Sequence, residues 1–306
     1  MEPFPAVLSK PRICFTPANQ AAILPRMGRT PEHTAVRFWR DPDLPGLEVR
    51  FSSYSEEIFR KHTHDAYSVG LIETGRTVFF MHDAHHNAQA GQIALIPPDT
   101  VHACNPDTDS DMTYRMFYIA PELMHGIAAE MAGCAATIPE FEAAVVSDPA
   151  LFELFHALYQ SICDGAGRLE KEERLVGALV ALIVNHTRHA EVVPEHNMPE
   201  AVHTVQRYLK ANLSENVSLT ALSELAAVSR FHLLRIFQAQ TGLPPHAYHN
   251  QLRVNSAKQR LKAAIPLSQV AAEAGFSDQS HFSRVFKQFT GATPAQYRDA
   301  TAPENS

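Results

Sequence analysis

The C-terminal third of this chain contains an internal repeat, and no other feature limits the fold as strongly. Residues 222–229 align with residues 270–277, and small side chains occupy the middle of both stretches. Further on, Arg235 matches Arg284, and the offset between the copies changes from 48 to 49 residues. One extra residue therefore enters the second copy between Asp278 and His281. Two copies of one local pattern indicate two similar helical units.

Small residues in the middle of each copy favour a tight turn between two crossing helices. Ala226 and Ala227 in the first copy correspond to Ala274 and Gly275 in the second. A bulky side chain at this point would force the helices apart, and Gly275 can adopt the positive φ that such a turn requires. Each copy therefore predicts a helix-turn-helix unit. A linking helix is expected between the units, at about residues 245–263.

The second helix of each unit has an apolar and a polar face. The residues expected to face inward are Leu233, Ile236 and Phe237, then Phe282, Val285, Phe286 and Phe289. Side chains on the outer faces can read base edges or contact phosphates. The residues expected there are Arg230, Phe231, Leu234, Arg235, Gln238, Asp278, Gln279, Ser280, Ser283, Arg284 and Lys287. On the linking helix, Arg253, Lys258 and Arg260 are either phosphate contacts or solvated side chains.

Charge is distributed unevenly along the chain. Residues 201–306 contain 11 Lys and Arg against 6 Asp and Glu, whereas residues 1–200 contain 15 against 27. A basic C-terminal part on an acidic chain is typical of a DNA-binding domain joined to a domain with another task.

The stretch from Leu219 to Arg298 resembles the DNA-binding domain of the AraC/XylS family. Within it, GFSDQSHFSRVFKQFTGATPAQYR resembles the signature of the family's second unit closely. The resemblance implies two recognition helices that enter successive major grooves, roughly 34 Å apart, on one face of double-stranded promoter DNA. It also implies a bacterial transcriptional regulator, which would contact RNA polymerase if it acts as an activator.

The N-terminal part has a different pattern. Residues 36–120 alternate short strand-like segments with Gly, Pro, Asp and Asn turn signals, which predicts a β-sandwich or small barrel. The expected strands cover residues 47–51, 68–73, 77–81, 92–96 and 114–119. Residues 1–35 are rich in proline and predict an irregular arm.

Helical periodicity replaces the strand pattern after Pro121. Residues 121–188 predict amphipathic helices, which could cover the barrel or form a homodimer interface. Residues 189–200 contain two prolines and predict a linker, and residues 201–300 form the expected DNA-binding domain. The predicted fold class is α+β multidomain, with an N-terminal β-barrel flanked by helices and a C-terminal all-α domain containing two helix-turn-helix units.

Three histidines are candidates for a site inside the barrel. His62 and His64 form an HxH motif on an expected strand, where period-two geometry points both to one face. Gly91 and Pro97 then precede His102 at a characteristic spacing. Together these pieces resemble the cupin motifs, which implies a cupin-like effector domain. Metal-dependent cupins add a glutamate, but the corresponding positions here hold Ser68 and Val69, which argues against redox enzyme chemistry.

The histidine site has three alternative interpretations. His62, His64 and His102, together with Tyr67, could bind a small organic effector through hydrogen bonds. The same three histidines could instead bind a divalent metal such as Zn²⁺, Ni²⁺ or Fe²⁺, with water or Cys104 as a further ligand. They could also line a barrel mouth without any ligand. No other cofactor is expected.

The sequence thus predicts a ligand-responsive transcriptional regulator that binds promoter DNA and senses a small-molecule effector. A metal-sensing regulator is the alternative, and a metal-dependent cupin enzyme is less favoured because no nucleophile–histidine arrangement stands out. We expect a non-enzyme. No run of eighteen apolar residues and no N-terminal secretion pattern is found, so we expect no membrane partner and a cytoplasmic location.

Overall fold

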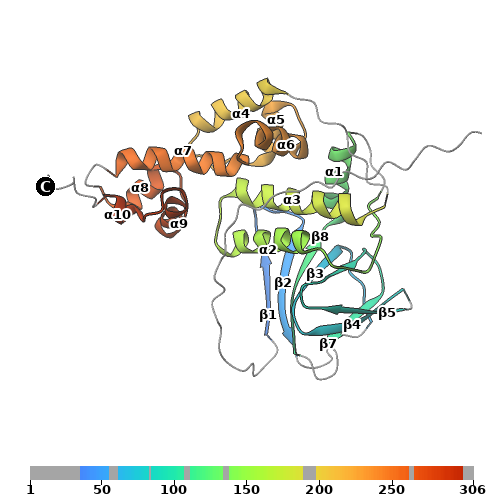
Figure 1. Ribbon diagram of the computed structural model, residues 1–306. Helices are drawn as coiled ribbons and strands as arrows, with labels where there is room; N and C mark the ends of the chain where they lie inside the picture. Colours follow the sequence, from blue (N-terminus) through green and yellow to red (C-terminus); the bar gives the residue numbers. More distant parts are fainter. Residues whose placement is uncertain are drawn as a thin grey trace, which may run out of the picture.

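The computed structural model describes residues 35–54, 61–82, 84–106, 111–133, 138–188, 198–261 and 265–298. A β region and three helices form its N-terminal half, and seven further helices form its C-terminal half (Figure 1). The arm predicted for residues 1–35 lies outside the described residues, apart from Ala35, as does most of the predicted linker. None of the described helices combines the length and the apolar character that crossing a membrane requires.

The strands form two antiparallel sheets rather than one continuous sheet. The larger sheet has the order β1-β2-β8-β3-β6-β9, and the smaller has the order β5-β4-β7. The strands are β1 (Ala35–Arg40), β2 (Leu47–Tyr54), β3 (Tyr67–Thr74), β4 (Arg76–Met81), β5 (Ala84–Gln89), β6 (Ile93–Ile96), β7 (His102–Pro106), β8 (Met112–Ile119) and β9 (Val145–Val146).

The five strands expected from the sequence are confirmed as β2, β3, β4, β6 and β8, with β6 beginning one residue later than expected, at Ile93. These segments contain the apolar residues that a half-buried strand needs, as in β8, where Met112, Tyr114 and Met116 are buried. By contrast, β5 and β7 have the sequences AHHNAQ and HACNP, which lack an apolar alternation. Both pair with β4 between them, so tertiary pairing rather than local propensity forms them.

Three helices, α1 (Pro121–Ala132), α2 (Pro149–Cys163) and α3 (Arg168–His186), follow β8, and the short strand β9 lies between α1 and α2. Helix α2 covers the larger sheet, where the ring of Phe155 lies 5.0 Å from that of Phe117 on β8. Helix α3 packs against α2 on one side and against the C-terminal helices on the other (Figure 1). Helix α2 thus covers the sheet, as one of the two alternatives predicted, whereas the packing of α3 between α2 and the C-terminal helices was not predicted.

The C-terminal half is entirely helical, as predicted. Its helices are α4 (Pro199–Ala211), α5 (Leu219–Ala226), α6 (Arg230–Thr241), α7 (Pro245–Arg260), α8 (Leu267–Glu273), α9 (Gln279–Thr290) and α10 (Pro294–Arg298). Helices α5 and α6 form the first helix-turn-helix unit, α8 and α9 form the second, and α7 links them.

The two turns have the predicted geometry. Ala227 and Gly275 both adopt the left-handed conformation, with φ of 53° and 82°, so the positive φ expected at Gly275 is confirmed. Ser229 and Asp278 then cap α6 and α9, each accepting a hydrogen bond from the backbone N–H three residues later. Such caps satisfy one of the free N–H groups at a helix start. The two copies of the repeat are therefore structurally equivalent.

The hydrophobic core does not follow the boundary between the two halves. One continuous cluster of buried residues extends from the larger sheet through α1, α2 and α3 into α4, α5 and α6. The second helix-turn-helix unit has a separate cluster, built from α7, α8 and α9. The first unit is thus packed into the N-terminal half, and the second is not.

Candidate functional sites: the recognition helices and the histidine cluster

The first recognition helix, α6, is only partly available to DNA. Leu233, Ile236 and Phe237 are buried as predicted. Phe231 and Leu234, expected on the outer face, are 4% and 7% exposed. Their predicted exposure is wrong because α6 does not stand alone: it lies against α1 and α3, and both side chains join the cluster that these helices share.

The three other residues of α6 that were predicted to contact DNA are also only partly accessible. Arg230, Arg235 and Gln238 are all partly buried. The guanidinium of Arg235 lies 5.2 Å from the ring centroid of Phe231, over its face. Arg230 is held by a carboxylate from the N-terminal half.

The second recognition helix, α9, is more open. Asp278, Gln279, Ser280 and Lys287 are exposed, and Ser283 and Arg284 are partly exposed. Phe282, Val285 and Phe286 are buried as predicted, but Phe289 is 37% exposed. The inward position expected for Phe289 is therefore wrong, because the neighbouring cluster closes around Phe286 without it. The backbone N–H of His281 holds the pKa of the Asp278 carboxyl below its usual value.

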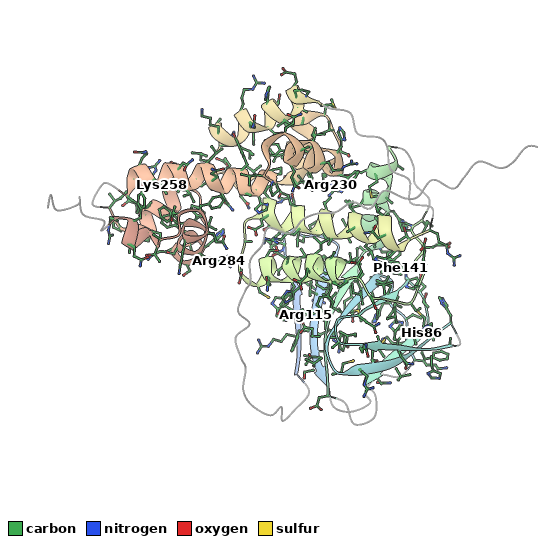
Figure 2. The ribbon with its side chains drawn as sticks, viewed as in Figure 1. His86, Arg115, Phe141, Arg230, Lys258 and Arg284 are labelled. Atoms are coloured by element: carbon green, nitrogen blue, oxygen red, sulfur yellow. The ribbon has the colours of Figure 1, made fainter. Side chains whose placement is uncertain are left out.

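Carboxylates of the N-terminal half contact both recognition helices, at Arg230 and Arg284, whose positions are labelled in Figure 2. Glu130 on α1 accepts hydrogen bonds from Arg230 Nε at 2.9 Å, from Arg230 Nη2 at 2.6 Å and from the Arg230 backbone N–H at 3.2 Å. Asp164, at the end of α2, pairs with Arg284, and its backbone oxygen accepts from Arg284 Nη2 at 3.2 Å. The first contact is partly buried, whereas the second is largely exposed.

Helix α3 provides two more carboxylates to the C-terminal helices. Glu172 Oε2 accepts from the backbone N–H of Leu219, the first residue of α5, at 2.5 Å. Glu173 Oε1 accepts from the backbone N–H of His246 near the start of α7 at 2.7 Å, and its Oε2 contacts His246 Nδ1 at 2.5 Å. Burial alone would lower the pKa of His246, but the facing Glu173 and Glu170 carboxylates raise it.

Arg253 on the linking helix is neither a phosphate contact nor a solvated side chain. It is 7% exposed, and its guanidinium donates to the backbone oxygens of Leu213 at 2.7 Å and Glu215 at 2.9 Å. Both sequence-based alternatives are therefore wrong for this residue. Of the two other cations, Lys258 is partly exposed, and Arg260 pairs with Glu273 at 2.5 Å.

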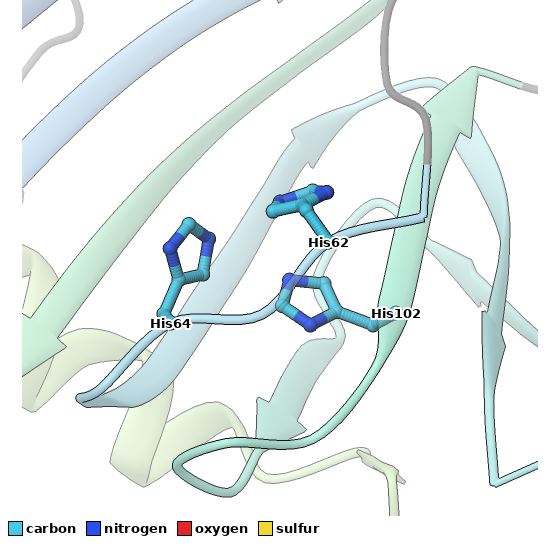
Figure 3. A group of neighbouring side chains, drawn as sticks. All are labelled: His62, His64 and His102. Atoms are coloured by element: carbon cyan, nitrogen blue, oxygen red, sulfur yellow. The ribbon is translucent and has the colours of Figure 1, made fainter.

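The three histidines of the β region converge (Figure 3). Potential ligand nitrogens of His62, His64 and His102 all lie within 4.8 Å of one another. The HxH segment is irregular rather than the strand expected. It is held in place by backbone hydrogen bonds of 2.9 Å between His62 and His102 in both directions, and of 2.7 Å from the Asp99 N–H to the His64 oxygen. These bonds bring the two distant motifs together.

Two imidazoles of the histidine cluster, those of His64 and His102, are disfavoured in the charged form by burial. Burial, helped by His102 and His62, lowers the pKa of His64 to about 4. Burial also lowers the pKa of His102, whose Nδ1 donates to the Thr100 oxygen at 2.8 Å. Because a carbonyl oxygen can only accept, Nδ1 carries the proton and Nε2 keeps a free lone pair. The cluster can therefore accept hydrogen bonds or bind a cation.

Tyr67 and Cys104 do not join this cluster. The Tyr67 hydroxyl donates to the Pro139 oxygen at 3.0 Å and lies 3.3 Å from His125 Nε2 on α1. Burial raises the pKa of the Cys104 thiol to about 12. The tyrosine beside the histidines is Tyr118, which the sequence pattern did not single out, with its ring 4.9 Å from that of His64. Tyr114, Met116 and Tyr118 share a face of β8, and this alternation is the same for a strand that only packs in a core, so the sequence contains no signal for Tyr118.

Comparisons with known proteins agree with this division. Residues 44–179 match the AraC-like ligand binding domain, and residues 222–300 match a helix-turn-helix domain. The HTH-type transcriptional regulator YbfI of Bacillus subtilis (strain 168) is 32% identical over 79% of this chain and 87% of its own length. The HTH-type transcriptional activator RhaR of Escherichia coli O139:H28 is 25% identical over 80% and 89%. A solved AraC-type transcriptional regulator from Chromobacterium violaceum is 29% identical over 33% of this chain and 90% of its own, with a TM-score of 0.31.

Proposed function

Because the chain belongs to the AraC family of transcriptional regulators, we propose that it binds promoter DNA through α6 and α9, and that an effector bound in the β region alters this binding. The observation that carries the proposal is the pair of equivalent helix-turn-helix units, each with a capped recognition helix. Arg235, Gln279, Ser283, Arg284 and Lys287 are the side chains we assign to base edges and phosphates.

Arg235→Ala combined with Arg284→Ala is expected to weaken binding to the operator by at least about 30-fold, because each arginine contact with a base contributes about 1–3 kcal/mol. The operator is obtained by selecting duplexes from a random-sequence library with the full chain at low salt. Affinity is then measured by fluorescence anisotropy over a range of salt concentrations, where lost phosphate contacts also reduce the salt dependence.

The matched control removes two arginines from the β region instead. Arg37 and Arg40 lie exposed on β1, so Arg37→Ala combined with Arg40→Ala lowers the net charge equally but leaves the recognition helices intact. Operator affinity should then change by less than about threefold. Unchanged binding in the Arg235 and Arg284 variant would contradict the assignment of these helices to DNA.

For the effector, we propose that the site is the histidine cluster with Tyr118. A small organic molecule carrying a hydroxyl or carboxyl group fits three imidazoles and a phenol that can exchange hydrogen bonds. Effector-dependent DNA binding requires that the molecule bind one of two protein arrangements more tightly.

We further propose that the protein acts in the cytoplasm as a regulator rather than as an enzyme. Dimerisation, and contact with RNA polymerase by an activator, stay predictions.

A divalent metal at the same cluster is the second candidate, supported by the convergence of the three imidazoles. Among the described residues, the convergent group holds no carboxylate, and Glu73, the first acid after residues 68–69, pairs with Arg115 instead. A set of three histidine ligands suits Zn²⁺, Ni²⁺ or Fe²⁺ and leaves a position open for water or an effector atom. The hydrogen bond from His102 Nδ1 to a carbonyl is the arrangement that fixes a metal-binding imidazole.

His62→Ala combined with His64→Ala is expected to abolish binding of about one metal ion per chain, measured by elemental analysis of untagged protein. Zn²⁺ at a hundred times its dissociation constant should stabilise the unmodified chain by about 2.7 kcal/mol but leave the variant unaffected. His85→Ala combined with His86→Ala, which removes two histidines from β5, is the control. Absence of metal from the unmodified chain after incubation with all three ions would exclude the metal candidate and leave the organic effector.

A further inference from the structure

We propose that the N-terminal half holds this protein in a state that binds DNA weakly, by placing its own carboxylates on groups of α5, α6 and α7 that would otherwise contact DNA phosphates and bases. The inference rests on the proposed function and adds its regulation. The sensor domain is defined as the part described within residues 35–188, and the DNA-binding domain as the part within residues 198–298.

Glu130 makes the central contact. Its carboxylate receives three N–H groups of Arg230, two from the guanidinium and one from the backbone. Arg230 is the first residue of α6, so Glu130 both neutralises the recognition helix's first cation and occupies its N-terminus. Reading bases requires the N-terminal residues of a recognition helix to enter the major groove. In this structure the Glu130 carboxylate of the sensor domain occupies the N-terminus of α6 instead.

The same arrangement recurs at two neighbouring helices. Glu172 and Glu173 of α3 accept the backbone N–H groups of Leu219 and His246, at the starts of α5 and α7. Helix N-termini are sites where proteins bind phosphate oxygens, including those of the DNA backbone. Carboxylates of the sensor domain therefore occupy the N-termini of three helices of the DNA-binding domain. Part of the excess of acidic residues within residues 1–200 is thus used for contacts with the DNA-binding domain.

Burial leads to the same conclusion independently of charge. Phe231 and Leu234 lie on the face of α6 that the repeat pattern assigns to DNA, yet they are buried in the cluster shared with α1 and α3. A major groove cannot accept this face while the sensor domain covers it. The contact between Asp164 and Arg284 extends the restraint to α9, but this pair is exposed and contributes less.

Glu130→Gln in the full chain is expected to bind the selected operator about tenfold more tightly than the unmodified chain without effector. The substitution removes a charged hydrogen-bond acceptor of Arg230, which stabilises only the state in which the sensor domain covers α6. Glu122→Gln is the matched control, since Glu122 lies exposed on the same helix and its loss changes the net charge equally. Amide hydrogen exchange of α6 should be faster in Glu130→Gln and unchanged in Glu122→Gln.

Three outcomes would overturn the proposal. Equal affinities of the Glu130→Gln and unmodified chains, or weaker binding by the variant, would show that the contact does not oppose DNA. Equal tightening by Glu122→Gln would show a general charge effect. Both results leave the proposed function intact, since the operator is still bound. Failure of every chain to bind any duplex at low salt would instead overturn the proposed function, and this regulation with it.

Discussion

Gly275→Ala is expected to destabilise the DNA-binding domain by about 3 kcal/mol. Gly275 has a φ of 82°, and a Cβ atom there would lie 2.5 Å from the Leu213 oxygen and 2.6 Å from the Ser214 Cα. The left-handed conformation costs an alanine about 1 kcal/mol or more, and a clash with backbone atoms, which no rotamer change relieves, adds about 1–3 kcal/mol. The free energy of unfolding, measured by urea titration, gives the loss directly.

Gly291→Ala separates the two causes. Gly291 also has a positive φ, 77°, but a Cβ atom there would have no neighbour within 4 Å. Only the conformational strain remains, so the expected loss is about 1 kcal/mol. If both alanine variants lose the same stability, the close approach of the second turn to residues 213–214 has no energetic role.

Arg253→Met is the second substitution with a large expected effect, again about 3 kcal/mol. The buried guanidinium satisfies two backbone oxygens, at Leu213 and Glu215, and lies 5.8 Å from the ring centroid of Phe276. Burial lowers the pKa of Arg253 to about 10, so it stays charged at neutral pH. Methionine fills similar volume but removes both hydrogen bonds, each of which contributes about 1.5–3 kcal/mol because its donor is charged. The Glu215 oxygen keeps the Val217 N–H at 3.0 Å, whereas the Leu213 oxygen loses the guanidinium.

Lys258→Met is the control for Arg253→Met, because it removes one cation from the same helix at a partly exposed position. Its effect on the free energy of unfolding should stay within about 0.5 kcal/mol. A similar loss in both variants would mean that net charge, rather than the two hydrogen bonds, stabilises the segment between α4 and α5.

The structure of the two C-terminal helix-turn-helix units could be predicted well, because it depends on residues that lie close together in the sequence. Small residues at the turns, the positive φ of Gly275 and the apolar faces of α6 and α9 depend on neighbours within one unit. The burial of Phe231 and Leu234 could not be predicted in this way. Whether that face of α6 meets DNA or protein depends on α1 and α3, which lie far away in the sequence and carry no signal of pairing with α6.

The sequence also predicted only part of the histidine cluster. The HxH spacing placed His62 and His64 together, and the cupin resemblance added His102. Neither indicated Tyr118, because a tyrosine in an alternating strand has the same pattern whether it lines a site or fills a core. Arg253 was misassigned for a related reason: a basic residue on a linking helix is usually exposed, and only the packing of residues 213–215 over it explains its burial.

The continuous core has a consequence for building chimeric regulators from this chain. A graft cut between residues 188 and 198 would remove α1 and α3 and uncover apolar side chains of α6, each of which contributes about 1.5–3 kcal/mol when buried. The core of the second helix-turn-helix unit would transfer intact, because α7, α8, α9 and their connecting residues form it, and on α7 the graft would uncover Tyr248 and Leu252, which pack against the first cluster. A donor fragment suited to a new sensor would therefore have to include α3, or accept a partner that supplies an equivalent helix.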